Sequence, residues 1–151
     1  MSEHSGGCLC GGLRYKGMGN PEIGAVCHCR YCQLRTGSAF GTLAYFKDEN
    51  VKITAGKGKE YSFTSESGTQ WETVFCDTCA TTVFIKLEVR AGLTGVTAGT
   101  LDPPTFWFDL DREAFTRSKA HFVGDIIAKD THETIAYYDP KIEEPKRRKG
   151  G

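Results

Sequence analysis

The sequence lacks the features that mark membrane, secreted or nucleic-acid-binding proteins. It has no run of about 18 apolar residues, and its opening residues, Met1 to Ser5, lack the basic and apolar regions of a signal peptide. Neither sign of charge dominates, because 19 Lys and Arg residues balance 19 Asp and Glu residues. Without excess positive charge, attraction to nucleic acid or to an anionic membrane is weak. We therefore predict a cytoplasmic protein with neither of these partners.

Long stretches with an apolar residue every three or four positions are also lacking, and 18 glycines lie among short β-favouring runs. A chain of 151 residues can bury a core without disulfides. The sequence thus predicts a mainly β fold, a compact single-domain antiparallel structure. The expected strands are residues 13–16, 23–28, 40–46, 51–54, 60–64, 72–75, 82–87 and 94–100.

The pattern is looser after Pro104. Residues 106–108 and 120–123 are candidate edge segments, and a helical turn is expected near residues 131–138. Residues 141–151 are rich in Lys, Arg and Glu and contain little that could anchor them to a core. We predict a domain over residues 1–140 and a flexible, solvated basic tail over residues 141–151.

Seven cysteines are an odd number for a closed disulfide framework, and a reducing compartment keeps cysteines as thiols. Metal binding is the better explanation, because the cysteines are tightly grouped. The three groups are Cys8 with Cys10, Cys27 with Cys29 and Cys32, and Cys76 with Cys79.

Two of the groups contain a C-x-x-C turn, which brings two sulfurs to one ion: Cys29 with Cys32, and Cys76 with Cys79. The C-x-C pair of Cys8 and Cys10 differs, since two residues apart on an extended strand their Cα atoms lie about 6.6 Å from each other. Glycines on both sides of this pair allow the backbone to bend. The sequence therefore favours a metal role for the first pair as well.

Seven ligands divide into four and three. Four thiolates close a structural zinc site, whereas three leave a position for water or substrate, as in a catalytic zinc site. The dense cluster Cys27, Cys29 and Cys32 is the natural set of three, which leaves Cys8, Cys10, Cys76 and Cys79 as the set of four. Spacing alone also permits a zinc ribbon made of Cys29, Cys32, Cys76 and Cys79.

His28 lies between two of these cysteines, yet alternation along a strand points it to the opposite face, so we expect no metal ligation by it. A redox dithiol at Cys76 and Cys79 is disfavoured, because that motif belongs at the start of a helix in an α/β pattern.

Three motifs together resemble the glutathione-dependent formaldehyde-activating enzyme family, which includes centromere protein V. They are residues 7–12 (GCLCGG), residues 27–32 (CHCRYC) with 36–40 (TGSAF), and residues 75–79 (FCDTC); residues 99–103 (GTLDP) resemble a further family signature. The resemblance spans roughly residues 5–125. The sequence departs from the family at two points. Ala80 directly follows the C-x-x-C turn of Cys76 and Cys79, where the family usually has glycine, and the tryptophan often found after the segment near His121 is missing.

The resemblance implies a β fold with two zinc ions. It places Cys8, Cys10, Cys76 and Cys79 on a structural zinc and Cys27, Cys29 and Cys32 on a catalytic one. It also implies a carbon–sulfur lyase like S-(hydroxymethyl)glutathione synthase, which combines glutathione with formaldehyde.

A zinc held by three thiolates is suited to binding a small thiol substrate such as glutathione. Arg30 and Arg35 flank the cluster and could bind a substrate carboxylate. Tyr31, Thr36 and Ser38 could donate a hydroxyl hydrogen bond to a developing oxyanion. The alternative is a zinc-stabilised protein-binding module without catalysis. A fourth protein ligand at the three-cysteine site would favour the module.

Overall fold

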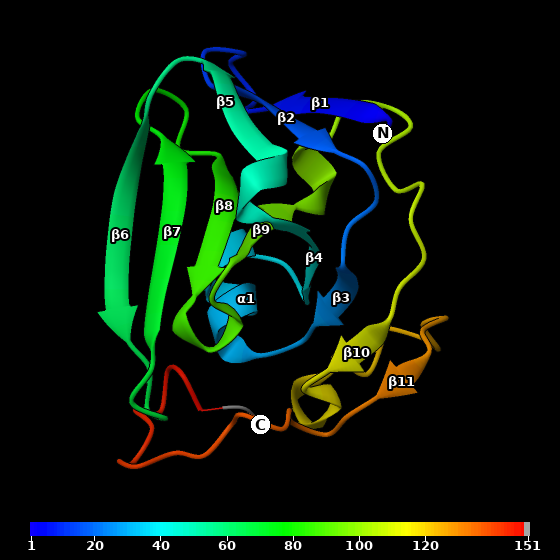
Figure 1. Ribbon diagram of the computed structural model, residues 1–151. Coiled ribbons are helices and arrows are strands. Elements are labelled where there is room, and N and C mark those ends of the chain that lie inside the picture. The colour runs from blue at the N-terminus through cyan, green and yellow to red at the C-terminus, as the bar shows by residue number, and fades with distance from the viewer. Residues whose placement is uncertain (150–151) are drawn as a thin grey trace.

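The computed structural model describes residues 1–149 and consists of two β-sheets around one core. The small sheet has the order β1-β2-β5, and the large one has the order β11-β10-β3-β4-β9-β8-β7-β6. In Figure 1 the small sheet crosses the top, and β6 to β8 stand at the left. The strands are β1 Glu3–Gly7, β2 Arg14–Met18, β3 Ile23–Cys27, β4 Gly41–Lys47, β5 Val51–Ala55, β6 Gly58–Thr64, β7 Gln70–Cys76, β8 Thr82–Leu87, β9 Leu93–Thr97, β10 Arg112–Ala114 and β11 Asp130–Thr131.

Burial follows each strand's place in the large sheet. The central strand β4 has a continuous buried run over residues 43–46, as expected of a strand covered on both faces. The edge strand β6 is mostly exposed and carries Lys59 and Glu60, which discourages pairing with another chain. The main core between the sheets contains Leu13, Tyr15, Phe46, Val83, Phe84 and Val96.

The prediction of a mainly β, antiparallel single domain is confirmed, and its eight expected strands correspond to β2 through β9. All pairings are antiparallel except those of β10 with β3 and with β11. The strands β1, β10 and β11 were not predicted from the sequence. β1 is built of small and polar residues, and the other two are three and two residues long, too short for a period-two pattern.

Three finer expectations were wrong. Residues 106–108 and 120–123 form no strand, and residues 131–138 contain the last residue of β11, a bend and a turn rather than a helical turn. The helix that does form is α1, Arg30–Thr36. Its seven residues are too few for a helical pattern, and it is defined by its ends, with Cys29 as N-cap and Gly37 as left-handed C-cap. Four 3₁₀ turns, Asp48–Asn50, Glu88–Arg90, Ala98–Thr100 and Thr116–Ser118, complete the helical content of residues 1–149.

Candidate functional site

The first cysteine cluster joins two turns that lie far apart in the sequence. The Sγ atoms of Cys8, Cys10, Cys76 and Cys79 all lie within 4.8 Å of one another. Cys8 and Cys10 occupy the turn between β1 and β2, where Gly11 adopts a φ of 78°. Cys76 is the last residue of β7, and Cys79 lies in the turn between β7 and β8. The expected extended C-x-C is therefore a turn, which brings the sulfurs of Cys8 and Cys10 to 3.5 Å from each other.

Backbone N–H groups surround the sulfurs of this four-cysteine cluster. Leu13 donates to the Cys8 sulfur at 3.2 Å, and Thr78 donates to the Cys76 sulfur at 3.4 Å. The hydrogen bond from the Thr81 hydroxyl, together with backbone donors, lowers the pKa of Cys79 to about 5. The Gly12 N–H acts in the same direction on Cys10, but the neighbouring sulfurs outweigh it and raise the pKa of Cys10 to about 12. The four sulfurs could all be thiolates together only with a cation among them, because like charges at this spacing raise one another's pKa.

The second cluster is compact in sequence and buried. The Sγ atoms of Cys27, Cys29 and Cys32 also lie within 4.8 Å of one another. Cys27 ends β3, Cys29 caps α1, and Cys32 lies in the first turn of the helix, where its N–H points at the Cys29 sulfur at 3.4 Å. Within residues 1–149 no further His, Cys, Asp or Glu joins this group. An ion in this cluster would therefore have three protein ligands and one coordination position left for another molecule.

The three-cysteine cluster is uneven in charge. Hydrogen bonds from the Cys27 and Cys29 thiols lower the pKa of Cys32 well below its usual value, and the positive charge of Arg35 acts in the same direction. The pKa of Cys27 is instead raised, chiefly by its contacts with the other two sulfurs and then by burial. Of the three sulfurs, Cys32 is therefore the one whose thiolate form its neighbours favour, and Arg35 contributes to this.

His28 faces away from both clusters. Its ring is fully buried, and Nε2 lies 2.8 Å from a carboxylate oxygen of Glu113 on β10. The same oxygen accepts an ion pair from Lys119 at 2.9 Å. This placement agrees with the expectation that His28 does not bind metal. The expected cause was alternation along a strand, but β3 ends at Cys27, and the chain after it directs the ring toward β10.

The four-cysteine cluster has the dimensions of a tetrahedral zinc site. Zinc–sulfur bonds of about 2.3 Å place the sulfurs of one site about 3.8 Å apart, and Cys10 and Cys76 have their sulfurs 3.7 Å apart. All seven cysteines are free thiols. The structure brings together the four and the three that the sequence partition predicts, and it separates the members of the alternative ribbon of Cys29, Cys32, Cys76 and Cys79 into different clusters. Two groups that could bind metal are thus present.

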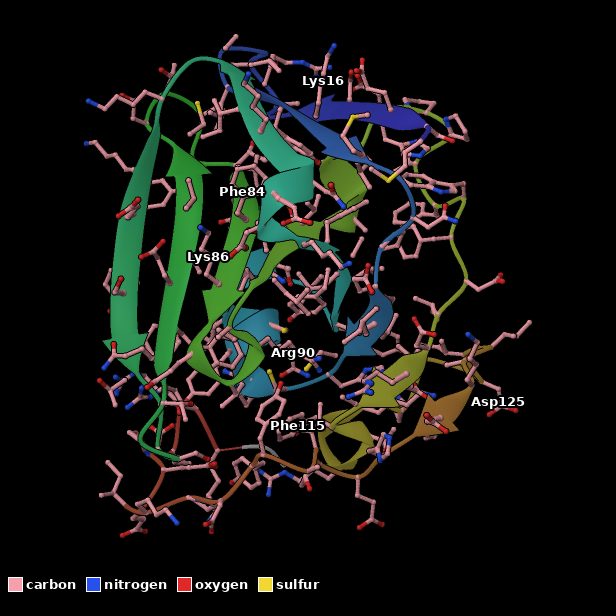
Figure 2. All side chains as sticks on the ribbon, viewed as in Figure 1. Lys16, Phe84, Lys86, Arg90, Phe115 and Asp125 are labelled. Atoms are coloured by element: carbon pink, nitrogen blue, oxygen red, sulfur yellow. The ribbon has the colours of Figure 1, made fainter. Side chains whose placement is uncertain are left out.

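A cavity adjoins the three-cysteine cluster at the lower end of the molecule. Its volume is about 50 Å³, and Cys27 and Cys29 form part of its wall. Figure 2 labels Phe115, which lines it, and Arg90, which stacks on the lining residue Tyr137 with 5.5 Å from Cζ to the ring centroid. This is room for a few water molecules or a small carbonyl compound.

The side chains expected to assist at this site divide into two groups. Arg30 and Tyr31 line the cavity, and the Tyr31 hydroxyl is buried with no hydrogen-bond partner in the described part of the chain. Arg35, Thr36 and Ser38 line a separate open groove with Phe40 and Thr82. Thr36 and Ser38 therefore lie outside the cavity, and Arg35 contributes its positive charge to the lowered pKa of Cys32.

Several residues around the cavity were missed from the sequence. They come from the β6–β7 turn, from the 3₁₀ turn after β10 and from the C-terminal segment: Ser65, Glu66, Thr69, Arg117, Tyr137, Tyr138, Glu144 and Arg148. No local motif surrounds them. Only the tertiary arrangement brings them to the cysteines, and no sequence signal could have identified them.

The C-terminal segment contacts the domain at several points, although most of its residues up to Lys149 are exposed. Arg148 pairs with Glu66 at 2.7 Å, and Arg30 Nε donates to the carbonyl oxygen of Arg147 at 3.0 Å. In Figure 1 this orange to red segment passes below α1 and the ends of β6 and β7. Residues 150 and 151 of the expected tail lie outside the described residues. The domain boundary at residue 140 and the flexibility of the tail stay predictions.

None of the helices within residues 1–149 has the length and apolar character needed to cross a membrane.

Comparisons with known proteins agree with the fold and the cysteine clusters described above. A crystal structure of a Rhodobacter sphaeroides protein superimposes with a TM-score of 0.53 and 18% identity over 69% of this chain and 95% of that one, which supports the fold alone. An uncharacterized lyase of Schizosaccharomyces pombe (strain 972) is 29% identical over 84 residues, 56% of this chain. The match spans 58% of that relative's length.

The family comparison covers most of the domain. A sequence profile of the glutathione-dependent formaldehyde-activating enzyme family matches residues 3–118. The matched range contains all seven cysteines and both clusters, and it ends before the C-terminal segment that closes the cavity. The chain therefore belongs to the glutathione-dependent formaldehyde-activating enzyme family.

Proposed function

We propose that the protein is a zinc-dependent carbon–sulfur lyase that makes or cleaves adducts of a small thiol with formaldehyde. The observation that carries the proposal is the three-cysteine cluster: its sulfurs could hold an ion, residues 1–149 supply no fourth ligand, and a cavity opens beside two of the sulfurs. Family membership and the lyase name of the yeast relative support the reaction class.

Two zinc ions per chain are proposed, one for each cluster. Cys8, Cys10, Cys76 and Cys79 would hold a structural ion that ties the β1–β2 turn to the β7–β8 turn. Cys27, Cys29 and Cys32 would hold the catalytic one. Zinc in that site supplies an exchangeable position that favours the thiolate form of a substrate thiol at neutral pH.

The reaction forms one carbon–sulfur bond. The thiol sulfur adds to the carbonyl carbon of formaldehyde, and the proton of the thiol ends on the former carbonyl oxygen; the reverse reaction breaks the same bond. The Tyr31 hydroxyl would donate to that oxygen; Tyr31 lines the cavity, and its hydroxyl has no hydrogen-bond partner among residues 1–149. Holding both reactants in a small space removes much of the entropic cost of their meeting.

The proposed substrate is a small thiol, and glutathione is the one that the family's name suggests. Arg30 and Arg117 line the cavity and can bind a carboxylate. Arg117 is already paired at 3.6 Å with the carboxylate of Glu144, whereas Arg30 donates to two neutral oxygens, those of the Gln33 side chain and the Arg147 carbonyl, so Arg30 is the better candidate. A location in the cytoplasm and the absence of a nucleic-acid partner are proposed on composition alone.

Cobalt substitution tests the proposal directly. Glutathione should change the thiolate-to-metal charge-transfer spectrum of the cobalt protein saturably, and Cys29→Ser should lose this response. With the zinc protein, formation or breakdown of the adduct should exceed the uncatalysed background. Lys52→Ala on the exposed strand β5 is the matched control and should behave like the parent.

Two outcomes would change the assignment. No spectral response to any small thiol, together with no acceleration, would replace the enzyme by the zinc-stabilised protein-binding module. A saturable response without formaldehyde chemistry would retain thiol binding and reject formaldehyde as the second substrate.

A further inference from the structure

Glu66 is a buried carboxylate in the wall of the proposed active-site cavity. Its side chain is 2% exposed, and it lines the same cavity as Cys27 and Cys29. A carboxylate this deeply buried requires a cation, because leaving it unpaired costs several kcal/mol. Within residues 1–149 its one ion-pair partner is Arg148, with 2.7 Å between Nη2 and Oε1.

That partner comes from a weakly held segment. Residues 139–149 contain no strand or helix, and Ile142 is 66% exposed. Most of the segment's attachments are polar: the Lys141 N–H donates to the Glu66 carbonyl at 2.6 Å, and the Asp139 N–H donates to the Ser67 hydroxyl at 3.0 Å. A segment with few buried apolar contacts opens at low free-energy cost. Arg148 is also the more exposed of the two partners, with 22% of its side chain exposed against 2% for Glu66, so Arg148 is the partner that an entering cation would displace.

Arg148 also separates two spaces. It lines the small cavity of about 50 Å³ beside the cysteines, and it lines a larger cleft of about 360 Å³. Tyr31 and Trp71 border both spaces as well. A thiol larger than a few atoms does not fit the small cavity alone. Withdrawal of Arg148 would join the two spaces and leave Glu66 facing the entering molecule.

We propose that Glu66 selects thiols that carry an ammonium group, and that Arg148 occupies the position of this ammonium until such a thiol enters. The inference rests on the proposed function, because it assumes that a thiol binds at the three-cysteine site. Glu66 is a specificity-determining residue in this scheme, and Arg148 is an internal competitor. Glu66 takes no part in bond formation.

Two thiols of equal length test the proposal. Cysteamine carries an ammonium group where 2-mercaptoethanol carries a hydroxyl, and both are titrated into the cobalt-substituted protein. Glu66→Gln should lower the ratio of cysteamine affinity to mercaptoethanol affinity about tenfold, the effect of losing one charge-assisted hydrogen bond. Arg148→Gln should raise this ratio, because the competitor is gone. Comparing ratios removes the different intrinsic acidities of the two thiols, since these are the same for every variant.

Matched controls separate the two residues from general charge effects. Glu60→Gln on the exposed strand β6 and Lys146→Gln in the C-terminal segment remove the same charges elsewhere and should leave the ratio unchanged. Trypsin gives a readout independent of the metal: cysteamine should accelerate cleavage after Arg147 or Arg148 in the parent protein, and mercaptoethanol should not.

The outcomes distinguish a failure of the role of Glu66 from a failure of the proposed lyase function. Binding of both thiols with a ratio unchanged in Glu66→Gln and in Arg148→Gln overturns the role of Glu66 alone. If Glu66→Gln does not fold, an unchanged or lowered ratio in Arg148→Gln still overturns it. Absence of any thiol response in the parent protein overturns the proposed function, and the inference with it.

Discussion

The two cysteine clusters use the same side chain in opposite surroundings. The four-cysteine cluster lies at the surface, with Cys10 exposed, and its ligands come from turns more than 60 residues apart: the sulfurs of Cys10 and Cys76 are in contact across 66 residues. The three-cysteine cluster lies within six consecutive residues, with Cys29 and Cys32 buried, beside a cavity. A cross-link between distant turns suits a structural role, whereas a local and incomplete cluster beside a cavity suits chemistry.

The largest difference between the clusters should appear when each loses one ligand. Cys76→Ser should abolish cooperative folding or cost at least about 3 kcal/mol, because the ion in a structural site contributes directly to folding. Cys29→Ser should remain folded, since β3 and α1 are held by other contacts. Thermal unfolding followed by circular dichroism compares the two. The reverse order of stability would exchange the roles of the clusters.

Metal removal should also discriminate between them. Fresh, reduced protein should contain two zinc ions, and mild chelation should remove the ion of the three-cysteine cluster first with the fold retained, because four fixed thiolates bind better than three with an exchangeable ligand. Native mass spectrometry counts the ions, and circular dichroism follows the fold. A single ion in fresh protein would contradict the two-site arrangement.

Acid should weaken the side of the domain that carries the three-cysteine cluster. Asp111 accepts from the Gly24 N–H at 2.8 Å and pairs with Lys129 at 2.9 Å. These partners lower the pKa of Asp111 below its ordinary value of 3.8. Its stabilising contribution is therefore complete above that value and is lost as the pH falls through the lower folded-state pKa. Asp111→Asn should cost about 1 kcal/mol at pH 7.

The difference between Asp111→Asn and the parent should shrink as the pH falls below 3.8, the ordinary pKa of this carboxyl. Urea unfolding at several pH values measures this convergence. Asp77→Asn is the matched control, because its carboxylate lies in the exposed turn of the four-cysteine cluster. A constant difference across the pH range would contradict the assigned role of Asp111.

The smallest expected effect concerns the turn of the four-cysteine cluster. Ala80 has a φ of 62° and donates from its N–H to the Cys76 carbonyl at 2.9 Å. A residue with a side chain is strained in this left-handed conformation. Ala80→Gly should therefore stabilise the protein by about 0.5 to 1 kcal/mol, measured by denaturant unfolding. Ala91→Gly, at an ordinary negative φ of −52°, is the control and should not stabilise.

Prediction from sequence succeeded where local chemistry was sufficient. Short β-favouring runs separated by turn residues identified β2 through β9, and cysteine spacing identified the two groups that the fold assembles. It failed for α1, whose seven residues depend on their caps, and for β10, whose three residues depend on pairing with β3. In such short elements tertiary contacts outweigh intrinsic preference.

The sequence by itself determined the mainly β character, the grouping of the cysteines and the family, because periodicity and ligand spacing are properties of neighbouring residues. Only the tertiary structure decided what surrounds the three-cysteine cluster. It turned His28 toward Glu113 and brought Arg148 onto Glu66 from a position 82 residues later in the chain. A cavity is made by elements remote in sequence, and its composition is decided where their packing brings them together.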